Sequence, residues 1–243
     1  MKSRNLLGCA PSTKAKPFLE ESQMKKPELN IKIYSDIVCP WCYIGKRRLS
    51  KALDQVKEQY DVTLAWQPFE LNPDMPEEGA DRKEYRIRKF GSEERSKELA
   101  AQVVAVAEQE GLAFDMDKIE RIPNTFAAHR LLRYAYAEGR QEQVIEVLFR
   151  KYFVEGRDVG QQLELLDAAV AGGLDRAATE TFLNAEDDIE LLRLDEEKGL
   201  RLGVNGVPFY VINDTYGISG AQAPETFVRA FAEATAVAEA LNK

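Results

Sequence analysis

The fold is decided by the stretch Asn30-Ile-Lys-Ile-Tyr-Ser-Asp-Ile-Val-Cys-Pro-Trp-Cys-Tyr-Ile-Gly45. Its first residues alternate between apolar and polar side chains, which predicts a strand over residues 30–35. A helix is predicted over residues 39–59, because apolar side chains recur there on one helical face. Residues 62–68 alternate again and predict a second strand. A single helix between two strands suits parallel neighbours in a sheet.

The two cysteines of this stretch fall at the start of the predicted helix, with Pro40 and Trp41 between them. The first helical turn has unpaired N–H groups and the positive end of the helix dipole, and both favour a thiolate over a thiol. Pro40 suits this turn because its missing N–H would be unpaired there anyway. We expect Cys39 to be the more exposed thiol, with Cys42 within disulfide reach of it. Trp41 is expected to form part of the rim around the exposed thiol.

The remainder of the chain changes from a helical pattern to a strand pattern. Residues 81–184 read as helical throughout, with glycines where helices are expected to end. Residues 207–212 predict a strand, and Asn213-Asp214 predicts a turn into a partner strand over residues 216–219. A last helix is predicted to start near Pro224. This order of elements predicts an α/β protein with a thioredoxin-like fold and an inserted all-helical domain.

We predict four segments along the chain. They are an N-terminal extension in residues 1–29, a first part of the thioredoxin core in 30–78, the helical insertion in 79–185 and a second part of the core in 186–243. The extension contains Cys9, shows no periodicity and lacks the apolar core of a secretory signal. We interpret it as disordered, with an organellar transit peptide as the alternative. The expected location is the cytoplasm, where structural disulfides are rare.

Composition excludes several classes of protein. The 243 residues include 33 Lys plus Arg and 41 Asp plus Glu, so the net charge is −8, which argues against nucleic-acid binding. No run of about 18 apolar residues occurs, so we expect no membrane span. Three cysteines are too few, and odd in number, to staple a chain of this length. The fold must therefore depend on its hydrophobic core.

Four blocks of sequence carry a resemblance to a known family. They are Asp36-Ile-Val-Cys-Pro-Trp-Cys-Tyr-Ile-Gly45, Ile122-Pro-Asn-Thr-Phe-Ala-Ala-His-Arg130, Gly203-Val-Asn-Gly-Val-Pro-Phe209 and Ser219-Gly-Ala-Gln222. In order and spacing they resemble the DsbA-like thioredoxin family, and within it most closely the FrnE-type oxidoreductases. The resemblance runs from about residue 30 to about residue 235.

The resemblance implies roles for several residues. It implies that Cys39 is the nucleophile, that Cys42 is the resolving thiol and that the Val207–Pro208 peptide is cis and lies beside them. Such a loop would present the backbone of Val207 to an extended substrate. The alternative interpretation of Pro208 is a proline at the entry to a strand.

These observations predict a thiol–disulfide oxidoreductase that works through a mixed disulfide. Its partner would be a protein or small-molecule thiol or disulfide. We expect no bound cofactor, although glutathione is a candidate redox partner or co-substrate. The alternative is a glutathione-dependent isomerase or transferase of the chromene-carboxylate isomerase or kappa type, whose pattern places serine at the position of Cys39. A structural zinc site is not expected, because only Cys9 and His129 are available to complete four ligands.

Three further polar residues are candidates for the cleft or for accepting a proton: Asp36, Asn124 and His129. Asp36 is either a buried proton acceptor for Cys42 or a loop residue that bonds the backbone. The resemblance suggests that His129 shapes the cleft, whereas the residues alone favour a partly buried histidine with its hydrogen bonds satisfied. The basic run of residues 82–89 is balanced by acidic neighbours and is interpreted as a solvated helix face.

Overall fold

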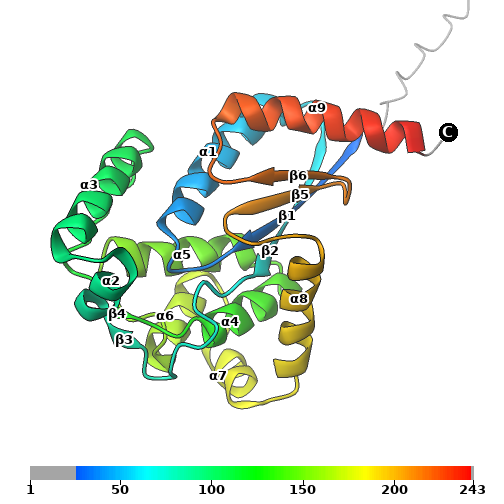
Figure 1. Cartoon of the computed structure of the whole chain (residues 1–243). Helices are drawn as coiled ribbons and strands as arrows, with labels where there is room; N and C mark the ends of the chain where they lie inside the picture. Colours follow the sequence, from blue (N-terminus) through cyan, green and yellow to red (C-terminus); the bar gives the residue numbers. More distant parts are fainter. Residues whose placement is uncertain (1–25, 242–243) are drawn as a thin grey trace, which may run out of the picture.

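The structure is a computed structural model that describes residues 26–241 of the chain (Figure 1). Its first elements are β1 (Glu28–Ser35), α1 (Pro40–Val56) and β2 (Asp61–Pro68). β1 and β2 pair in parallel along their whole length. The predicted strand–helix–strand unit is therefore confirmed, although α1 ends three residues before the predicted boundary at residue 59.

Two further strands complete the main sheet on the other side of β1. β5 (Phe209–Ile212) pairs antiparallel with β1, and β6 (Tyr216–Ser219) pairs antiparallel with β5, so the strand order is β2-β1-β5-β6. Asn213 and Asp214 join the hairpin with positive φ angles of 48° and 57°, which a tight hairpin turn requires. The predicted hairpin is confirmed. Its first strand begins after Pro208, which has no N–H to contribute to the ladder.

Helices dominate the segment between β2 and β5. They are α2 (Arg82–Phe90), α3 (Glu93–Gln109), α4 (Phe126–Ala137), α5 (Gln141–Phe153), α6 (Gln162–Ala171), α7 (Arg176–Asn184) and α8 (Ile189–Arg201). We call α2 to α7 the helical insertion. Within residues 26–241, no helix is long and apolar enough to cross a bilayer.

The sequence prediction for this segment is wrong in two places. β3 (Ala80–Asp81) and β4 (Arg121–Ile122) pair antiparallel where helix was predicted. Strands of two residues are too short to leave an alternating pattern in the sequence. The sequence reading also missed α8, which lies beyond the predicted end of the helices at residue 184. The predicted segment boundaries at residues 79 and 185 fall between regular elements, but the boundary at residue 29 is wrong, because β1 already begins at Glu28.

Helices cover both faces of the main sheet (Figure 1). α9 (Pro224–Leu241) starts where it was predicted and packs with α1 on the face where Ile31 and Ile33 of β1 are buried. On the other face, Tyr34 of β1 lies against α8. A Cβ atom at Gly199 of α8 would lie 2.6 Å from the Tyr34 ring, so this close approach requires glycine.

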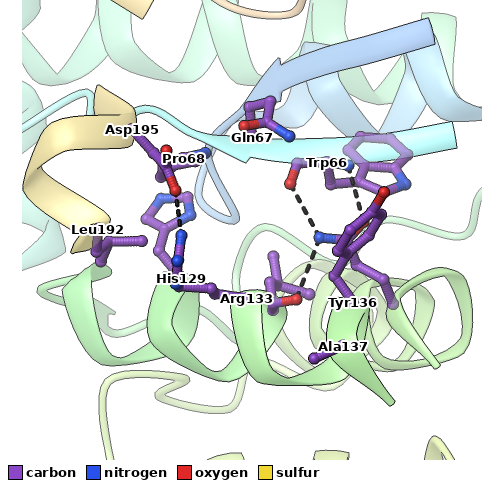
Figure 2. Close-up of a pocket in the computed structure, with 11 residues that line it drawn as sticks. Trp66, Gln67, Pro68, His129, Arg133, Tyr136, Ala137, Leu192 and Asp195 are labelled. Atoms are coloured by element: carbon purple, nitrogen blue, oxygen red, sulfur yellow. Dashed lines mark hydrogen bonds and ion pairs between the residues drawn. The ribbon is translucent and has the colours of Figure 1, made fainter. Parts of the chain in front are cut away.

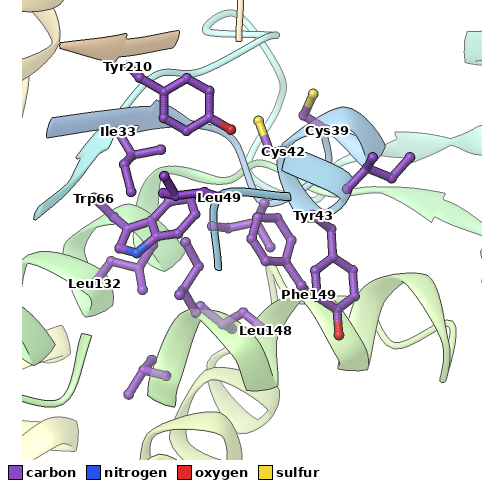
Figure 3. Close-up of a cluster of buried hydrophobic side chains, with 14 of the residues drawn as sticks. Ile33, Cys39, Cys42, Tyr43, Leu49, Trp66, Leu132, Leu148, Phe149 and Tyr210 are labelled. Carbon is purple, nitrogen blue, oxygen red and sulfur yellow. The ribbon is translucent and has the colours of Figure 1, made fainter. Parts of the chain in front are cut away.

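One hydrophobic cluster joins the sheet to the helical insertion (Figure 3). Tyr43 of α1 stacks on Phe149 of α5 with ring centroids 4.9 Å apart, and Phe149 meets Trp66 of β2 edge to face at 6.2 Å. The Tyr43 hydroxyl also donates to Glu146 of α5 at 2.7 Å. These contacts hold the first turns of α1 against the insertion, and both cysteines lie in or next to those turns.

Gln141, the first residue of α5, forms hydrogen bonds with the backbone of β2. Its Oε1 accepts from the Trp66 N–H at 2.8 Å, and its Nε2 donates to the Trp66 carbonyl at 2.9 Å. The same Nε2 donates to the Leu132 carbonyl at 3.1 Å. Because Gln141 is buried, these bonds are protected from water, and they tie the insertion to the outer strand of the sheet.

Candidate active site

Cys39 and Cys42 lie at the start of α1, as the sequence predicted. Cys39 is the N-cap residue in an extended conformation, and Pro40 begins the helix directly after it. The N–H of Cys42 donates to the carbonyl of Cys39 at 3.0 Å, which closes the first turn. Both cysteines are free thiols; Cys39 is 4% exposed and Cys42 is fully buried. Cys39 is therefore the more accessible sulfur of the pair.

A loop from the far end of the chain faces Cys39. The Val207–Pro208 peptide is cis, as the family resemblance implied, and the Cys39 thiol donates to the Val207 carbonyl at 3.5 Å. Gly45 of α1 makes this approach feasible, since a Cβ there would lie 2.3 Å from the Tyr210 hydroxyl and 3.2 Å from the Pro208 ring. Figure 3 shows the Tyr210 oxygen pointing toward the start of α1.

The environment of Cys42 differs from that of Cys39. Burial raises the pKa of the Cys42 thiol well above its ordinary value, and the neighbouring Cys39 raises it further. The Ser35 side chain and the backbone of Asp36 act in the opposite direction. Cys42 is thus held as a neutral thiol, which leaves Cys39 as the sulfur able to react first with a molecule from solvent.

A cavity of about 370 Å³ opens beside Cys39, between the start of α1, the cis-proline loop and the helical insertion. We call it the Cys39 cavity. Its lining includes Pro40, Trp41 and Val207 from the core, and Arg86 and Lys89 from α2. Trp41 is 40% exposed and forms part of the rim, as predicted.

The interpretation of the basic run as a solvated helix face alone is therefore incomplete. Arg86 and Lys89 come from this run and line the Cys39 cavity, although the Arg86 guanidinium donates to Ser96, which lines a neighbouring hollow. The sequence could not place them there, because the position of α2 depends on its packing against α3 and the β3–β4 pair. Because acidic and basic residues are equally frequent in the surrounding segment, its composition does not indicate that these two cations line the same cavity.

Asp36 and His129 form a buried pair, and neither lines the Cys39 cavity. One carboxylate oxygen of Asp36 accepts from the Leu71 N–H at 2.7 Å, and the other accepts from the Val38 N–H at 3.4 Å. Asp36 thus bonds the backbone, which is one of the two roles expected for it. His129 Nε2 lies 3.7 Å from Asp36 Oδ1.

His129 is more deeply buried than the sequence suggested. It is 3% exposed, and within the described part of the chain its Nε2 has no hydrogen-bond partner, so the expectation of a partly buried, satisfied histidine is wrong. Burial alone would lower the pKa of His129, but the Asp36 carboxylate, with Glu70 and Glu196 behind it, raises the pKa overall. Charge attraction therefore outweighs desolvation at this ring.

Asn124 has a structural position at the start of α4. Its side-chain amide donates to the Met75 carbonyl at 2.7 Å, and its side-chain oxygen accepts from the Phe126 N–H at 2.9 Å. It does not line the Cys39 cavity. Of the nine residues proposed from the sequence, Asn124 is thus one that the fold does not bring to Cys39.

A second cavity, of about 290 Å³, lies between β2, α4 and α8 (Figure 2). His129 and Trp66 line it, together with Arg133, which forms an ion pair with Asp195. Neither the cysteine pair nor the cis-proline loop contributes to this lining. In residues 26–241, no three His, Cys, Asp or Glu side chains gather closely enough to hold a metal ion.

Sequence reasoning missed two neighbouring carboxyl groups near His129, the buried Glu70 and the half-buried Glu196. Glu70 follows β2 and accepts from Arg193 of α8 at 2.7 Å. Its other oxygen, and one oxygen of Glu196, are buried without a hydrogen-bond partner among the described residues. Burial, and then the charge of Glu196, raise the pKa of Glu70 to about 7. A proton on Glu70 would satisfy this arrangement, because one carboxyl group can donate to the other.

We expect the protein to lose stability as the pH rises from about 4.5 to about 7. Over this range folded Glu70 keeps a proton that the unfolded chain releases, so the folded state is disfavoured by rising pH. The raised pKa of His129 acts in the same direction, since the folded state loses that proton as the pH rises. In Glu70→Gln the fall in the free energy of unfolding between pH 4.5 and pH 7 should be smaller than in the wild type by about 1–3 kcal/mol. Urea unfolding at a series of pH values measures it.

Glu77→Gln is the matched control for this measurement. Glu77 is an exposed carboxylate on the same loop, so its replacement should leave the pH dependence of the wild type in place. Equal pH dependence in the Glu70→Gln variant and the wild type would contradict the assignment of the titration to Glu70.

The fold and the site together define a class of protein. A sheet of order β2-β1-β5-β6, a Cys-x-x-Cys motif at the start of α1 and a cis-proline loop facing it are the parts of a thioredoxin-like protein. The model of the DSBA-like thioredoxin domain matches residues 30–232, and the chain belongs to this family.

Comparison with individual proteins agrees with this assignment. A probable DsbA oxidoreductase from Streptomyces coelicolor is 34% identical, with a TM-score of 0.79 over 85% of this chain and 90% of that chain. The uncharacterized protein YwbO of Bacillus subtilis is 26% identical over 84% of this chain and 96% of its own length. A 2-hydroxychromene-2-carboxylate isomerase is 18% identical, with a TM-score of 0.64 over 88% of this chain and 98% of that one, which shows a shared fold.

Proposed function

We propose that the protein is a thiol–disulfide oxidoreductase of the FrnE type, in which Cys39 attacks and Cys42 resolves. The observation that carries the proposal is the contrast between the two sulfurs. Cys39 opens on a cavity at the start of a helix, whereas Cys42 is sealed behind it with a raised pKa. An accessible nucleophile backed by a protected second thiol is the arrangement that a two-step exchange needs.

The proposed reaction transfers two electrons. The Cys39 thiolate bonds to one sulfur of a substrate disulfide, the substrate S–S bond breaks, and the departing thiolate takes up a proton. Cys42 then gives up its proton and attacks Cys39, which releases the second substrate thiol. The products are a Cys39–Cys42 disulfide and a reduced substrate. The same steps in reverse oxidise a substrate dithiol.

The residues around the pair support binding of the substrate. Trp41 and Pro40 would contact it at the rim of the Cys39 cavity, and Val207 and Pro208 would face it from the opposite side. Since the two cysteines hold the electrons, the reaction as proposed needs no bound cofactor. Glutathione is a candidate redox partner, and a protein or a small molecule is the candidate substrate. We propose a cytoplasmic location, where such a dithiol is kept cycling.

Trapping of the mixed disulfide tests the proposal. We expect Cys42→Ser, exposed to glutathione disulfide, to stop at a glutathione adduct on Cys39, because the resolving sulfur is missing. The wild type should go on to the Cys39–Cys42 disulfide. Peptide mapping by mass spectrometry distinguishes the two products.

The same experiment discriminates against the isomerase or transferase alternative. That chemistry keeps glutathione at the site and has no use for Cys42, so the wild type would then hold glutathione without forming the internal disulfide. A redox titration against glutathione measures the reduction potential of the Cys39–Cys42 pair, which determines the direction of the reaction. A potential of about −270 mV favours reduction of substrates, and one of about −120 mV favours their oxidation.

A further inference from the structure

The Cys39 cavity has a charge opposite to that of the chain. Acidic residues outnumber basic ones by 41 to 33, yet no Asp or Glu lines this cavity, whereas Arg86 and Lys89 do. Arg86 donates to the Ser96 side chain at 2.7 Å, and Lys89 donates to the Tyr85 hydroxyl at 2.8 Å. Their partners are neutral, and within residues 26–241 no carboxylate pairs with either cation. The cavity is therefore a local region of positive charge beside the nucleophile.

The two cations differ in their surroundings: Arg86 also lines a neighbouring hollow with Asp81, Glu93, Asp117 and Glu120, whereas Lys89 lines the Cys39 cavity alone. Burial lowers the pKa of Arg86, and the neighbouring Arg82 lowers it further. This direction is expected for a partly buried cation that makes no ion pair. An anion bound in the cavity would relieve the repulsion and would be attracted to the site from solution.

The other walls of the cavity are mainly apolar and in part aromatic, with Asn72 and Gln102 as polar exceptions. They include Trp41, Leu71, Phe90, Leu99, Val103 and Met116. The Arg86 guanidinium lies over the Phe90 ring, 4.9 Å from its centroid, so charge and aromatic surface are adjacent. A volume of about 370 Å³ is in the range of pockets for small molecules. An occupant that matches all of this is small, flat and apolar, with a negative end.

We propose that the Cys39 cavity selects low-molecular-weight disulfides in which an aromatic body bears a carboxylate. The carboxylate would lie at Arg86 and Lys89, the ring against the apolar wall, and the near sulfur at Cys39. This inference rests on the proposed function and names its substrate class. In the reaction the Cys39 sulfur bonds to the near sulfur, the S–S bond breaks, and the distal sulfur leaves as an aryl thiolate.

Three disulfides separate the contributions of charge and ring. Cystamine and dithiodipropionate are aliphatic and opposite in charge, and dithiodibenzoate adds the aromatic body to the anion. For each disulfide we divide the rate at which it oxidises the reduced wild type by the rate at which it oxidises mercaptoethanol. This ratio, the corrected rate, removes the intrinsic reactivity of the disulfide. We expect the corrected rate to rise in that order, by roughly tenfold from cation to anion. Added salt should narrow the difference.

Two variants on one helix localise the effect. Lys89→Gln should lower the corrected rate with dithiodibenzoate by roughly threefold to tenfold, and it should raise the corrected rate with cystamine, because a cation that repels cystamine is removed. Arg88→Gln removes the same charge from an exposed neighbour that does not line the cavity, and it should change neither rate.

Two results would overturn the inference while leaving the proposed function intact. One is equal corrected rates for cystamine and dithiodipropionate, and the other is equal effects of Lys89→Gln and Arg88→Gln. If none of the three disulfides oxidises the wild type to the Cys39–Cys42 disulfide, the proposed function itself fails.

Discussion

Replacing Cys39 by serine is expected to lower the rate of disulfide exchange by roughly a thousandfold or more. A serine hydroxyl does not form the anion that attacks a disulfide near neutral pH, and Cys42 cannot take its place. Cys42 is fully buried, and burial raises the pKa of its thiol. The rate at which the reduced protein cleaves dithiodipropionate measures the loss.

Cys9→Ser is the control for this variant. It makes the same chemical change at the third cysteine, which lies outside the described residues, and it should leave the exchange rate unchanged. The circular dichroism spectrum of Cys39→Ser checks that the variant keeps its fold. We expect an unchanged spectrum, because the hydrogen bond from the Cys39 side chain to the Val207 carbonyl is weak. If Cys39→Ser kept the wild-type rate, exchange through Cys39 would have to be abandoned.

Replacing Arg130 by methionine is expected to destabilise the protein by about 3–5 kcal/mol. The Arg130 guanidinium is buried, and it donates to Asp188 at 2.6 Å and to the Leu183 carbonyl at 2.9 Å. It also bonds the carbonyls of Phe182 and Ala185, which end α7. Methionine would leave the buried carboxylate and these carbonyls without their donor. Urea unfolding followed by circular dichroism measures the change.

Arg133→Met on the same helix provides the comparison. Arg133 pairs with Asp195 but is 35% exposed, so its removal should cost less than about 1 kcal/mol. Replacing both Arg130 and Asp188 by apolar residues should recover part of the loss, because no buried charge is then left unpaired. Equal destabilisation by Arg130→Met and Arg133→Met would contradict the assigned role of the buried pair.

The part of the site that is local in the sequence could be predicted from it. The alternation before Cys39 and the apolar face after Cys42 place both sulfurs at a helix start, and the structure confirms that position. The hairpin could be predicted for a similar reason, since Asn213 and Asp214 carry their own turn preference. Short-range geometry is sufficient wherever a few neighbouring residues determine the backbone.

The parts that depend on packing between distant segments could not be predicted. Arg86 reaches the Cys39 cavity only because α2 packs against α3 and both helices line the side opposite the start of α1, and nothing in its own neighbourhood indicates this. The pKa of Glu70 is raised by burial and then by the charge of Glu196, which is far away in the sequence and belongs to a helix that periodicity did not reveal. The cis form of the Val207–Pro208 peptide came from the family resemblance, because the chemistry of an X–Pro bond alone favours trans.

The hydrogen bonds of Gln141 have a consequence for association between molecules. β2 is an edge strand, and such strands present free N–H and C=O groups to which a strand of another chain can add. At Trp66 the N–H and the C=O are both hydrogen-bonded to the side-chain amide of Gln141, which occupies the place of a neighbouring strand. The helical insertion therefore prevents another chain from pairing with β2 at Trp66.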